Sequence, residues 1–445
     1  MTKYHFIYPD VGTYYFPSVH HGLAQLISIL KEHNHEASLH HITKLPKPQE
    51  ILDRIQLESP DIIGFTAMSN QMEFVKLWSK WIKERYNIPI VCGGVHATLN
   101  PEEVLSDSNI DFVCVGEGDY AVTNKEFWYK RFGGIQKTLP YNLVDNLDKL
   151  PFPDYDLFDM EKILKRSNGE FPVIVSRGCP YNCAYCSNSA LQERYKGLGK
   201  YFRYRSVDNA IEMLQYYIWK YPIKHFTFAD DIFGIADHWV YEFCEKYPQK
   251  IDRPFDCNLR VEMVDVELLE SLKKAGCTKV EMGIESGNEF IRYNSLNRKM
   301  TNEQIIKAFA LCREYGIKTR SYNMIGLPSD IKDTIQETID LNKKVQPDEV
   351  AVFYFYPFKG TKLYDDCQKQ GLLTDQTATS YVNKSILKLP NITQKELKKL
   401  YDEFNRFAIR QRLSKSWRWV LPIIRCLTLG NDVSFIRGVY QWLKS

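Results

Sequence analysis

The sequence contains no apolar run long enough to cross a membrane and no opening segment typical of a secretory signal peptide. Its formal net charge is only +3 over 445 residues, which gives no argument for nucleic acid as a partner. Eleven cysteines without an export signal are not expected to form a disulfide framework. We therefore expect a cytoplasmic protein whose thiols are reduced.

A glycine-rich dinucleotide motif is also missing after the first expected strand, where the chain reads YPDVGTYYFPSVHHG. The loose match Gly116-Glu117-Gly118 with Ala121 follows the last strand of the series instead. Glu117 would bring negative charge toward a pyrophosphate at that position. Nicotinamide binding is therefore a weak interpretation of this match.

The first 135 residues alternate short β-branched segments with helical patterns, such as Leu23, Leu26, Ile27 and Leu30 at i, i+3, i+4 and i+7. This alternation predicts a doubly wound, Rossmann-like parallel sheet over residues 1–135. Its strands are expected at 3–8, 37–42, 61–66, 88–93 and 111–116.

Three small, polar or glycine-rich loops follow these strands: TAMSNQ (66–71), GGVHATLNPEE (93–103) and GEGD (116–119). Ligands of such sheets bind beyond the carboxyl ends of the strands. Because glycine lacks a Cβ, these loops would let a large ligand approach the backbone closely.

Residues 136–168 carry Pro140, Pro151 and Pro153 without a clear period and are expected to be a linker. A second βα series over 169–360 predicts an open, partial (β/α)6 TIM-like barrel, because six units are too few for a closed barrel of eight. Gly276 and Gly316 stand where two of its helices should end. A carboxyl-terminal helical extension is expected over 361–445. The barrel strands are expected at 171–176, 224–230, 255–260, 278–284, 317–325 and 349–356.

RGCPYNCAYCSN (177–188) places Cys179, Cys183 and Cys186 at C-x-x-x-C-x-x-C spacing after the first strand of the second series. No second C-x-x-C pair exists, so a zinc ribbon is excluded. Iron–sulfur clusters are held by cysteine thiolates, usually four. Three cysteines therefore suit a [4Fe-4S] cluster with one iron left free for a substrate or cofactor.

This motif resembles that of the radical S-adenosylmethionine superfamily, and the likeness runs from residue 171 to about 360. TFADDIF (227–233), NLR (258–260), GIESG (283–287) and MIGLP (324–328) follow at strand ends in the family's order. The resemblance implies that S-adenosylmethionine chelates the free iron. Its further contacts would come from Tyr185, Asp230, Arg260, Glu285, Ser286 and Ile325.

Two segments depart from that pattern. PFKGT (357–361) stands where Pro-Gly is often found, and Ser329-Asp330 stands where Gly-Glu is frequent.

The amino-terminal segments PDIIGFT, IPIVCGGVHATLNPEE and VCVGEGD resemble the cobalamin-binding domain of cobalamin-dependent radical enzymes. The D-x-H-x-x-G sequence that supplies a cobalt ligand elsewhere is absent, and an unligated lower face is common in this subclass. A role for His96 behind the corrin or at the surface is therefore favoured over ligation of cobalt. The resemblance implies cobalamin contacts from Ser69, Asn70, Gly93, Gly94, His96, Glu117 and Gly118.

The function implied is a methyltransferase acting on an unactivated carbon of a small molecule or natural product, through a 5′-deoxyadenosyl radical and methylcobalamin. One alternative uses the same cofactors for oxidative cyclisation or ring rearrangement without methyl transfer. A cobalamin or redox sensor is the other, and the cysteine trio with Arg260 and Glu285 argues against it. A methylthiotransferase is excluded, because the amino-terminal domain lacks a further cysteine set.

Two partners besides the small-molecule substrate are considered. The radical chemistry implies an external electron donor of flavodoxin or ferredoxin type. From Arg410 onward the chain has seven Lys or Arg against one acidic residue, Asp432, interleaved with tryptophans. Such a segment is typical of peripheral contact with an anionic membrane, although a helical cap on the barrel is the favoured interpretation.

Overall fold

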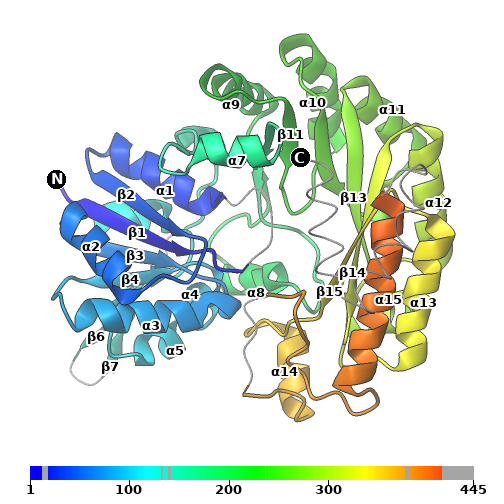
Figure 1. Ribbon diagram of the computed structural model, residues 1–445. Helices are drawn as coiled ribbons and strands as arrows, with labels where there is room; N and C mark the ends of the chain where they lie inside the picture. The colour runs from blue at the N-terminus through cyan, green and yellow to red at the C-terminus, as the bar shows by residue number, and fades with distance from the viewer. Residues whose placement is uncertain (13–18, 132–133, 139–141, 236, 376–379, 413–445) are drawn as a thin grey trace. The chain divides into compact units, whose positions relative to one another are not determined.

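A computed structural model describes residues 1–12, 19–131, 134–138, 142–235, 237–375 and 380–412 of the chain (Figure 1). These residues form two compact units. The first unit comprises residues 1–233, 249–254 and 357–366. The second comprises residues 234–248, 255–356 and the chain from 367 onward.

The amino-terminal sheet of the first unit has its strands in the order β2-β1-β3-β4-β5-β6-β7. The first five are parallel, which confirms the predicted doubly wound sheet. Strands β6 and β7 continue the sheet as an antiparallel hairpin that the sequence did not indicate. The strands are β1 (Lys3–Pro9), β2 (Glu36–Ile42), β3 (Ile62–Thr66), β4 (Ile90–Gly93), β5 (Phe112–Val113), β6 (Trp128–Arg131) and β7 (Gly134–Gln136).

Helices cover both faces of this sheet. Leu23, Ile27 and Leu30 are buried at the spacing that the sequence predicts for an amphipathic helix. On the other face Trp78 is fully buried in a core of isoleucines and valines. The helices are α1 (His21–Glu32), α2 (Pro48–Glu58), α3 (Met72–Lys83), α4 (Val95–Leu99), α5 (Pro101–Ser106) and α6 (Gly118–Asn124).

The segment expected to be a linker contains one helix, α7 (Met160–Arg166). Its start is capped by Asp159, whose carboxylate accepts a hydrogen bond of 3.1 Å from the Lys162 N–H. Two helical turns are too short for a hydrophobic period to stand out, so the pattern did not predict this helix.

The second series of strands forms a six-stranded sheet in the order β15-β14-β13-β12-β11-β8, which confirms the predicted open barrel. Gly276 and Gly316 end helices at φ +96° and +63°, where a side chain would be strained. The strands are β8 (Glu170–Val173), β11 (His225–Phe228), β12 (Phe255–Leu259), β13 (Cys277–Glu285), β14 (Lys318–Ile325) and β15 (Glu349–Tyr354). The helices between them are α9 (Val207–Lys220), α10 (Asp237–Lys250), α11 (Val266–Lys274), α12 (Asn302–Glu314) and α13 (Lys332–Val345).

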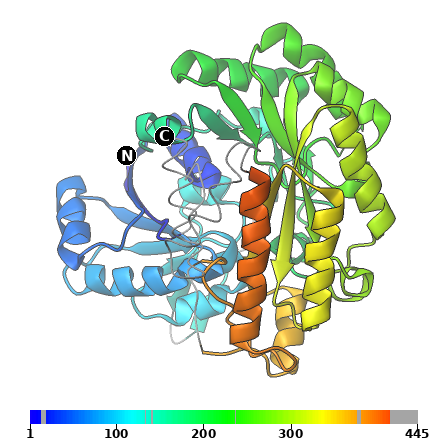
Figure 2. The same ribbon diagram turned by 45° about the vertical axis from the view of Figure 1, so that its right-hand side comes forward.

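Beyond residue 361 the described chain contains two helices, α14 (Lys362–Lys369) and α15 (Gln394–Arg412). In the second unit α15 packs beside α13 and against β15, and its Tyr401 ring stacks on Tyr354 at 4.3 Å (Figure 2). Among the described residues, no helix has both the length and the apolar character needed to cross a bilayer. The basic, tryptophan-containing segment begins at Arg410, and its part from residue 413 onward, for which a helical cap or contact with a membrane was considered, lies outside the described residues.

Candidate functional site

The three-cysteine loop lies in the first unit, between β9 (Ser176–Arg177) and α8 (Ser187–Arg194). None of its cysteines is in a disulfide. The Ser189 hydroxyl donates hydrogen bonds to the carbonyl oxygens of Cys183 at 2.9 Å and Cys186 at 2.8 Å. These bonds tie the two loop carbonyl groups to Ser189 in the first turn of α8 and so shape the loop.

Glycine is required at position 178, directly before the first cysteine. Its φ is +80°, and a Cβ there would lie only 2.4 Å from the carbonyl oxygen of Tyr201. Any side chain would therefore push the loop away from the segment that supports it.

The chemistry of the donor set fits an iron–sulfur cluster. Three cysteines stand on one short loop, and cysteine thiolates are the ordinary ligands of such clusters. Burial raises the pKa of the Cys186 thiol to about 12, so its thiolate needs a metal cation beside it.

Tyr185 and Asp230, two of the residues expected at S-adenosylmethionine, belong to the same unit as the cysteines. Asp230 follows β11 and is 1% exposed. Its Oδ1 accepts hydrogen bonds from the N–H groups of Val175 at 3.0 Å and Ser176 at 2.6 Å. Burial raises the pKa of Asp230 to about 7, while the bonds from Ser176 and Val175 act in the opposite direction. Asp230 thus supports the strand that leads into the cysteine loop.

Arg260, Glu285, Ser286 and Ile325 lie in the second unit, and all are buried. The Arg260 guanidinium donates to Glu262 at 2.5 Å. Glu285 pairs with Arg298 at 3.4 Å, a partner that the sequence analysis did not name. Glu285 also has φ +65°, a left-handed conformation that is uncommon for a non-glycine residue at the end of a strand.

The carboxyl edge of the amino-terminal sheet brings together two of the loops expected at cobalamin. The Ser69 hydroxyl and the Nδ1 atom of His96 share a hydrogen bond of 2.9 Å, and the His96 N–H donates to the carbonyl of Ala67 at 3.2 Å. Gly94 has φ +95°, and a Cβ there would lie 2.8 Å from the backbone N and O of Ala67. A Cβ on Gly93 would make only ordinary contacts, the nearest at 3.5 Å to Cys114. The absence of a side chain at Gly94 thus lets the loop after β4 lie directly against the Ala67 backbone, which brings two of the loops expected at cobalamin together.

His96 is 5% exposed, and burial lowers its pKa to about 4, so the imidazole is neutral near pH 7. Its Nε2 is buried without a hydrogen-bond partner among the described residues and lies 3.9 Å from the Glu103 carboxylate. A nitrogen covered in this way favours a role for His96 in holding the loop.

Glu117 and Gly118, the remaining expected cobalamin contacts, stand at the start of α6. Asn70, another of the expected cobalamin contacts, follows Ser69 in the sequence and is buried. The Glu117 carboxylate pairs with Arg177 at 3.2 Å and with Arg203 at 3.1 Å. Neither arginine was named from the sequence.

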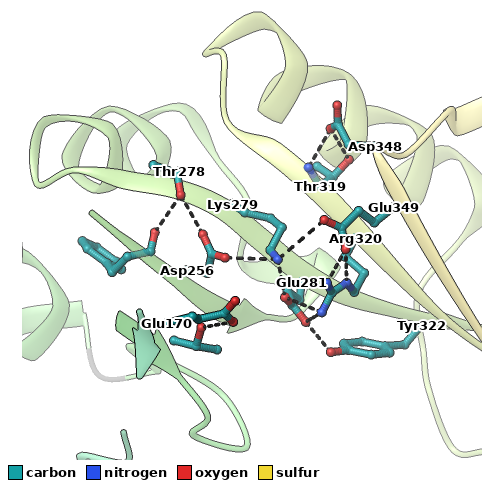
Figure 3. Close-up of polar contacts among 12 residues, drawn as sticks. Glu170, Asp256, Thr278, Lys279, Glu281, Thr319, Arg320, Tyr322, Asp348 and Glu349 are labelled. Atoms are coloured by element: carbon teal, nitrogen blue, oxygen red, sulfur yellow. Dashed lines mark hydrogen bonds and ion pairs between the residues drawn. The ribbon is translucent and has the colours of Figure 1, made fainter. Parts of the chain in front are cut away.

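A network of charged side chains on one face of the second unit was also missed by the sequence analysis (Figure 3). Lys279 lies 3.1 Å from Asp256 and 3.0 Å from Glu281. Arg320 donates to Glu281 at 2.9 and 3.0 Å and to Glu349 at 2.7 Å. We call this set the strand-face network; its members are Asp256, Lys279, Glu281, Arg320, Tyr322 and Glu349.

The register of the sheet explains the strand-face network. Glu281, Arg320 and Glu349 are direct cross-strand neighbours on β13, β14 and β15, and Asp256 stands opposite Lys279. Burial alone would lower the pKa of Lys279, but its carboxylate neighbours raise it above the usual value. The sequence did contain a signal for this network. On β13 the charged residues Lys279 and Glu281 alternate with apolar Val280 and Met282, so the two charged side chains lie on the same face of the sheet.

Replacing Arg320 by Ala should strongly destabilise the second unit. Arg320 is 26% exposed, and its loss leaves the buried Glu281 carboxylate without its bidentate partner. Removing one partner of a fully buried pair costs about 3–5 kcal/mol, and the loss here should be nearer about 2 kcal/mol because Lys279 remains 3.0 Å from Glu281. Urea unfolding followed by circular dichroism measures the change. Lys343→Ala, which breaks the exposed pairs with Asp340 at 3.0 Å and with Glu403 at 3.9 Å, should cost at most about 1 kcal/mol. Equal losses in the two variants would contradict a stabilising role of the network.

Comparison with known protein families gives two separate matches, one to the amino-terminal sheet and one to the region that begins with the strand before the cysteine loop. Residues 9–124 match the B12 binding domain, and residues 173–341 match the Radical SAM superfamily. Each match contains the loops described above: the sheet edge with Gly93 and Gly94, and the three-cysteine loop.

Individual relatives cover most of the chain. An uncharacterized methyltransferase of Pyrococcus horikoshii is 29% identical over 85% of this chain and 85% of its own. An anaerobic magnesium-protoporphyrin IX monomethyl ester cyclase of Rubrivivax gelatinosus is 25% identical over 79% and 71% of the two chains. Among solved structures, the radical S-adenosylmethionine methyltransferase TsrM of Kitasatospora setae matches with a TM-score of 0.67 at 15% identity, over 89% and 83% of the chains. That likeness shows a shared fold.

Proposed function

The chain belongs to the cobalamin-dependent radical S-adenosylmethionine enzymes, with a [4Fe-4S] cluster, S-adenosylmethionine and cobalamin as its cofactors, and we propose that it transfers a methyl group to an unactivated carbon of a small molecule. The observation that carries this proposal is the presence of both cofactor loops in one compact unit. The cysteine loop and the glycine-lined sheet edge both belong to residues 1–233.

Two similar proteins, one found by sequence and one by structure, support methyl transfer. The relative from Pyrococcus horikoshii is described as a methyltransferase, and so is the structural neighbour from Kitasatospora setae. The relative from Rubrivivax gelatinosus is a cyclase and supports the second candidate function, an oxidative cyclisation with the same cofactors.

Methyl transfer requires two fates for S-adenosylmethionine in one turnover. One molecule loses its methyl group and leaves as S-adenosylhomocysteine. The other takes up one electron and a hydrogen atom from the substrate carbon and leaves as 5′-deoxyadenosine and methionine. The bound cofactors supply this chemistry, while the protein provides binding and orientation. A flavodoxin- or ferredoxin-type donor would supply two electrons per turnover: one would cleave S-adenosylmethionine, and the other would return cobalamin to the state that accepts a methyl group.

The residues of this chain would divide these tasks. Cys179, Cys183 and Cys186 would hold three irons and leave the fourth open to the methionine part of S-adenosylmethionine. Arg260 would pair with the methionine carboxylate, since a guanidinium matches carboxylate geometry. It would then exchange its present partner Glu262 for the ligand.

The product ratio tests the proposal. With the true substrate, S-adenosylmethionine and a reductant, the holoenzyme should release 5′-deoxyadenosine and S-adenosylhomocysteine in about equal amounts, as measured by liquid chromatography with mass spectrometry. The substrate should gain one methylene unit. A cyclase would release almost no S-adenosylhomocysteine, and its product would lose hydrogens or be an isomer of the substrate.

Arg260→Ala should depress both products about 100-fold, because one cluster-bound position would serve both steps. Arg253→Ala is the matched control, since Arg253 lies two residues before β12 begins and donates to the carbonyl of Ile223. It should leave both products near the wild-type level. Loss of 5′-deoxyadenosine alone in Arg260→Ala would show that the methyl donor binds at a second site.

A further inference from the structure

Four charged side chains of the first unit form a chain of ion pairs between the cysteine loop and the carboxyl edge of the amino-terminal sheet. Acidic and basic residues alternate along this chain. Arg177 donates two hydrogen bonds to the Asp119 carboxylate, at 2.8 and 3.0 Å. Glu117 pairs with Arg177 at 3.2 Å and with Arg203 at 3.1 Å. The Asp119 and Arg203 side chains are only 4% and 2% exposed. We call Asp119, Arg177, Glu117 and Arg203 the charge clamp.

The members of the charge clamp come from segments that are far apart in the sequence. Glu117 ends the loop after β5 at the carboxyl edge of the amino-terminal sheet, and Asp119 stands in the first turn of α6 directly after it. Arg177 ends β9, two residues before Cys179, and stands opposite Arg203 on the antiparallel strand β10 (Arg203–Tyr204). Two arginines at paired positions repel each other. The two carboxylates offset that repulsion, so the strands that carry the cysteine loop depend on the loop after β5.

A second set of contacts joins the same two regions. Helix α8, which follows the cysteine loop, packs against α4 of the sheet edge. The Tyr195 ring at the end of α8 lies beside Gly116, where a Cβ would come within 3.4 Å of it. The Gly116 N–H in turn donates to the Thr98 hydroxyl at 3.2 Å. Unlike these contacts, the clamp includes a bidentate arginine–carboxylate pair, which fixes orientation as well as distance.

We propose that the charge clamp sets the separation of the [4Fe-4S] cluster and cobalamin, and that Arg177 and Asp119 are positioning residues for the transfer between them. This inference rests on the proposed function for its chemical consequence. In this role Glu117 orients the loop after β5 through the arginines. Since a misplacement of about 1 Å can cost about 100-fold in rate, a small change in the clamp has a large effect.

The test compares Arg177→Gln and Asp119→Asn with a matched control, Arg205→Gln. Arg205 is buried in the same unit, two residues beyond Arg203, but donates to Asn209 at 2.8 Å and to the carbonyls of Leu150 and Pro151. Each holoenzyme is first assayed for iron and cobalamin per chain. Pulsed electron paramagnetic resonance then measures how strongly the reduced cluster speeds the relaxation of cob(II)alamin, which depends on the separation of the two spins.

Both clamp variants should keep their cofactors yet show a changed relaxation enhancement, and their S-adenosylhomocysteine release should fall about 100-fold. Arg205→Gln should match the wild type in both measurements. If the enzyme were a cyclase, S-adenosylhomocysteine would be absent from every variant, while the relaxation measurement would still report the separation. Unchanged relaxation in fully loaded clamp variants would overturn the inference, and so would the same change in Arg205→Gln.

Arg177→Lys covers the case in which Arg177→Gln does not retain its cluster. It keeps the positive charge but loses the planar two-donor fork, so its relaxation enhancement should also differ from the wild type. Should Arg177→Lys and Asp119→Asn also lose the cluster while Arg205→Gln keeps it, the clamp would be a folding element, and the inference would be wrong.

Discussion

Replacing Cys179, Cys183 and Cys186 together by Ala should reduce the iron content of anaerobically isolated protein from about four atoms per chain to nearly none. The three thiolates are the cluster ligands that the chain offers at close spacing. The brown colour and the absorption of the cluster should disappear with the iron. Production of 5′-deoxyadenosine should fall to background, because the electron enters S-adenosylmethionine through the cluster.

Cys244→Ala is the matched control for this experiment. Cys244 is a buried thiol in α10 with no second cysteine at motif spacing, so it packs as a small apolar side chain. Its loss should leave the iron content unchanged and cost about 1 kcal/mol of stability. Full iron content in the triple variant would refute the assignment of the cluster ligands.

Gly93→Trp should weaken cobalamin binding about 100-fold or more, equivalent to about 3 kcal/mol. The indole would occupy the space that the corrin needs beyond β4. Gly93 is a better position than Gly94 for this test, because a Cβ at Gly93 would meet no protein atom closer than 3.5 Å and would not by itself disturb the fold. At Gly94 any side chain would strike the Ala67 backbone, so a loss of binding there would also report a disturbed fold.

Gly93→Ala provides the control, since a methyl group fits the measured space and should leave cobalamin affinity within about twofold of the wild type. Equilibrium binding of hydroxocobalamin, followed by its absorption spectrum, measures both variants. The iron content should be unaffected in each, which separates a local block from general unfolding. Normal cobalamin affinity in Gly93→Trp would show that the ligand lies elsewhere.

Local patterns in the sequence were sufficient for most of the fold. Short apolar, β-branched runs alternating with period-3.6 patterns predicted five parallel strands in the amino-terminal sheet and six in the barrel, because each pattern reflects surface that must be buried. The sequence analysis did not predict the hairpin β6–β7 or helix α7, because these elements are too short to show a hydrophobic pattern. The cysteine motif predicted its chemistry for a similar reason: three ligands within eight residues need no information from the rest of the chain.

The tertiary structure alone decided which side chains stand against one another. Arg177 and Asp119 are 58 residues apart, and Arg320 and Glu281 are 39 residues apart, so no local pattern could pair them. These charges are tolerated in buried positions because chain crossings bring opposite charges within hydrogen-bonding distance. The cysteine spacing thus indicated the cluster, and the resemblance of the two modules to known families indicated S-adenosylmethionine and cobalamin. Strand register and loop packing determined which charged side chains pair near the cofactor loops.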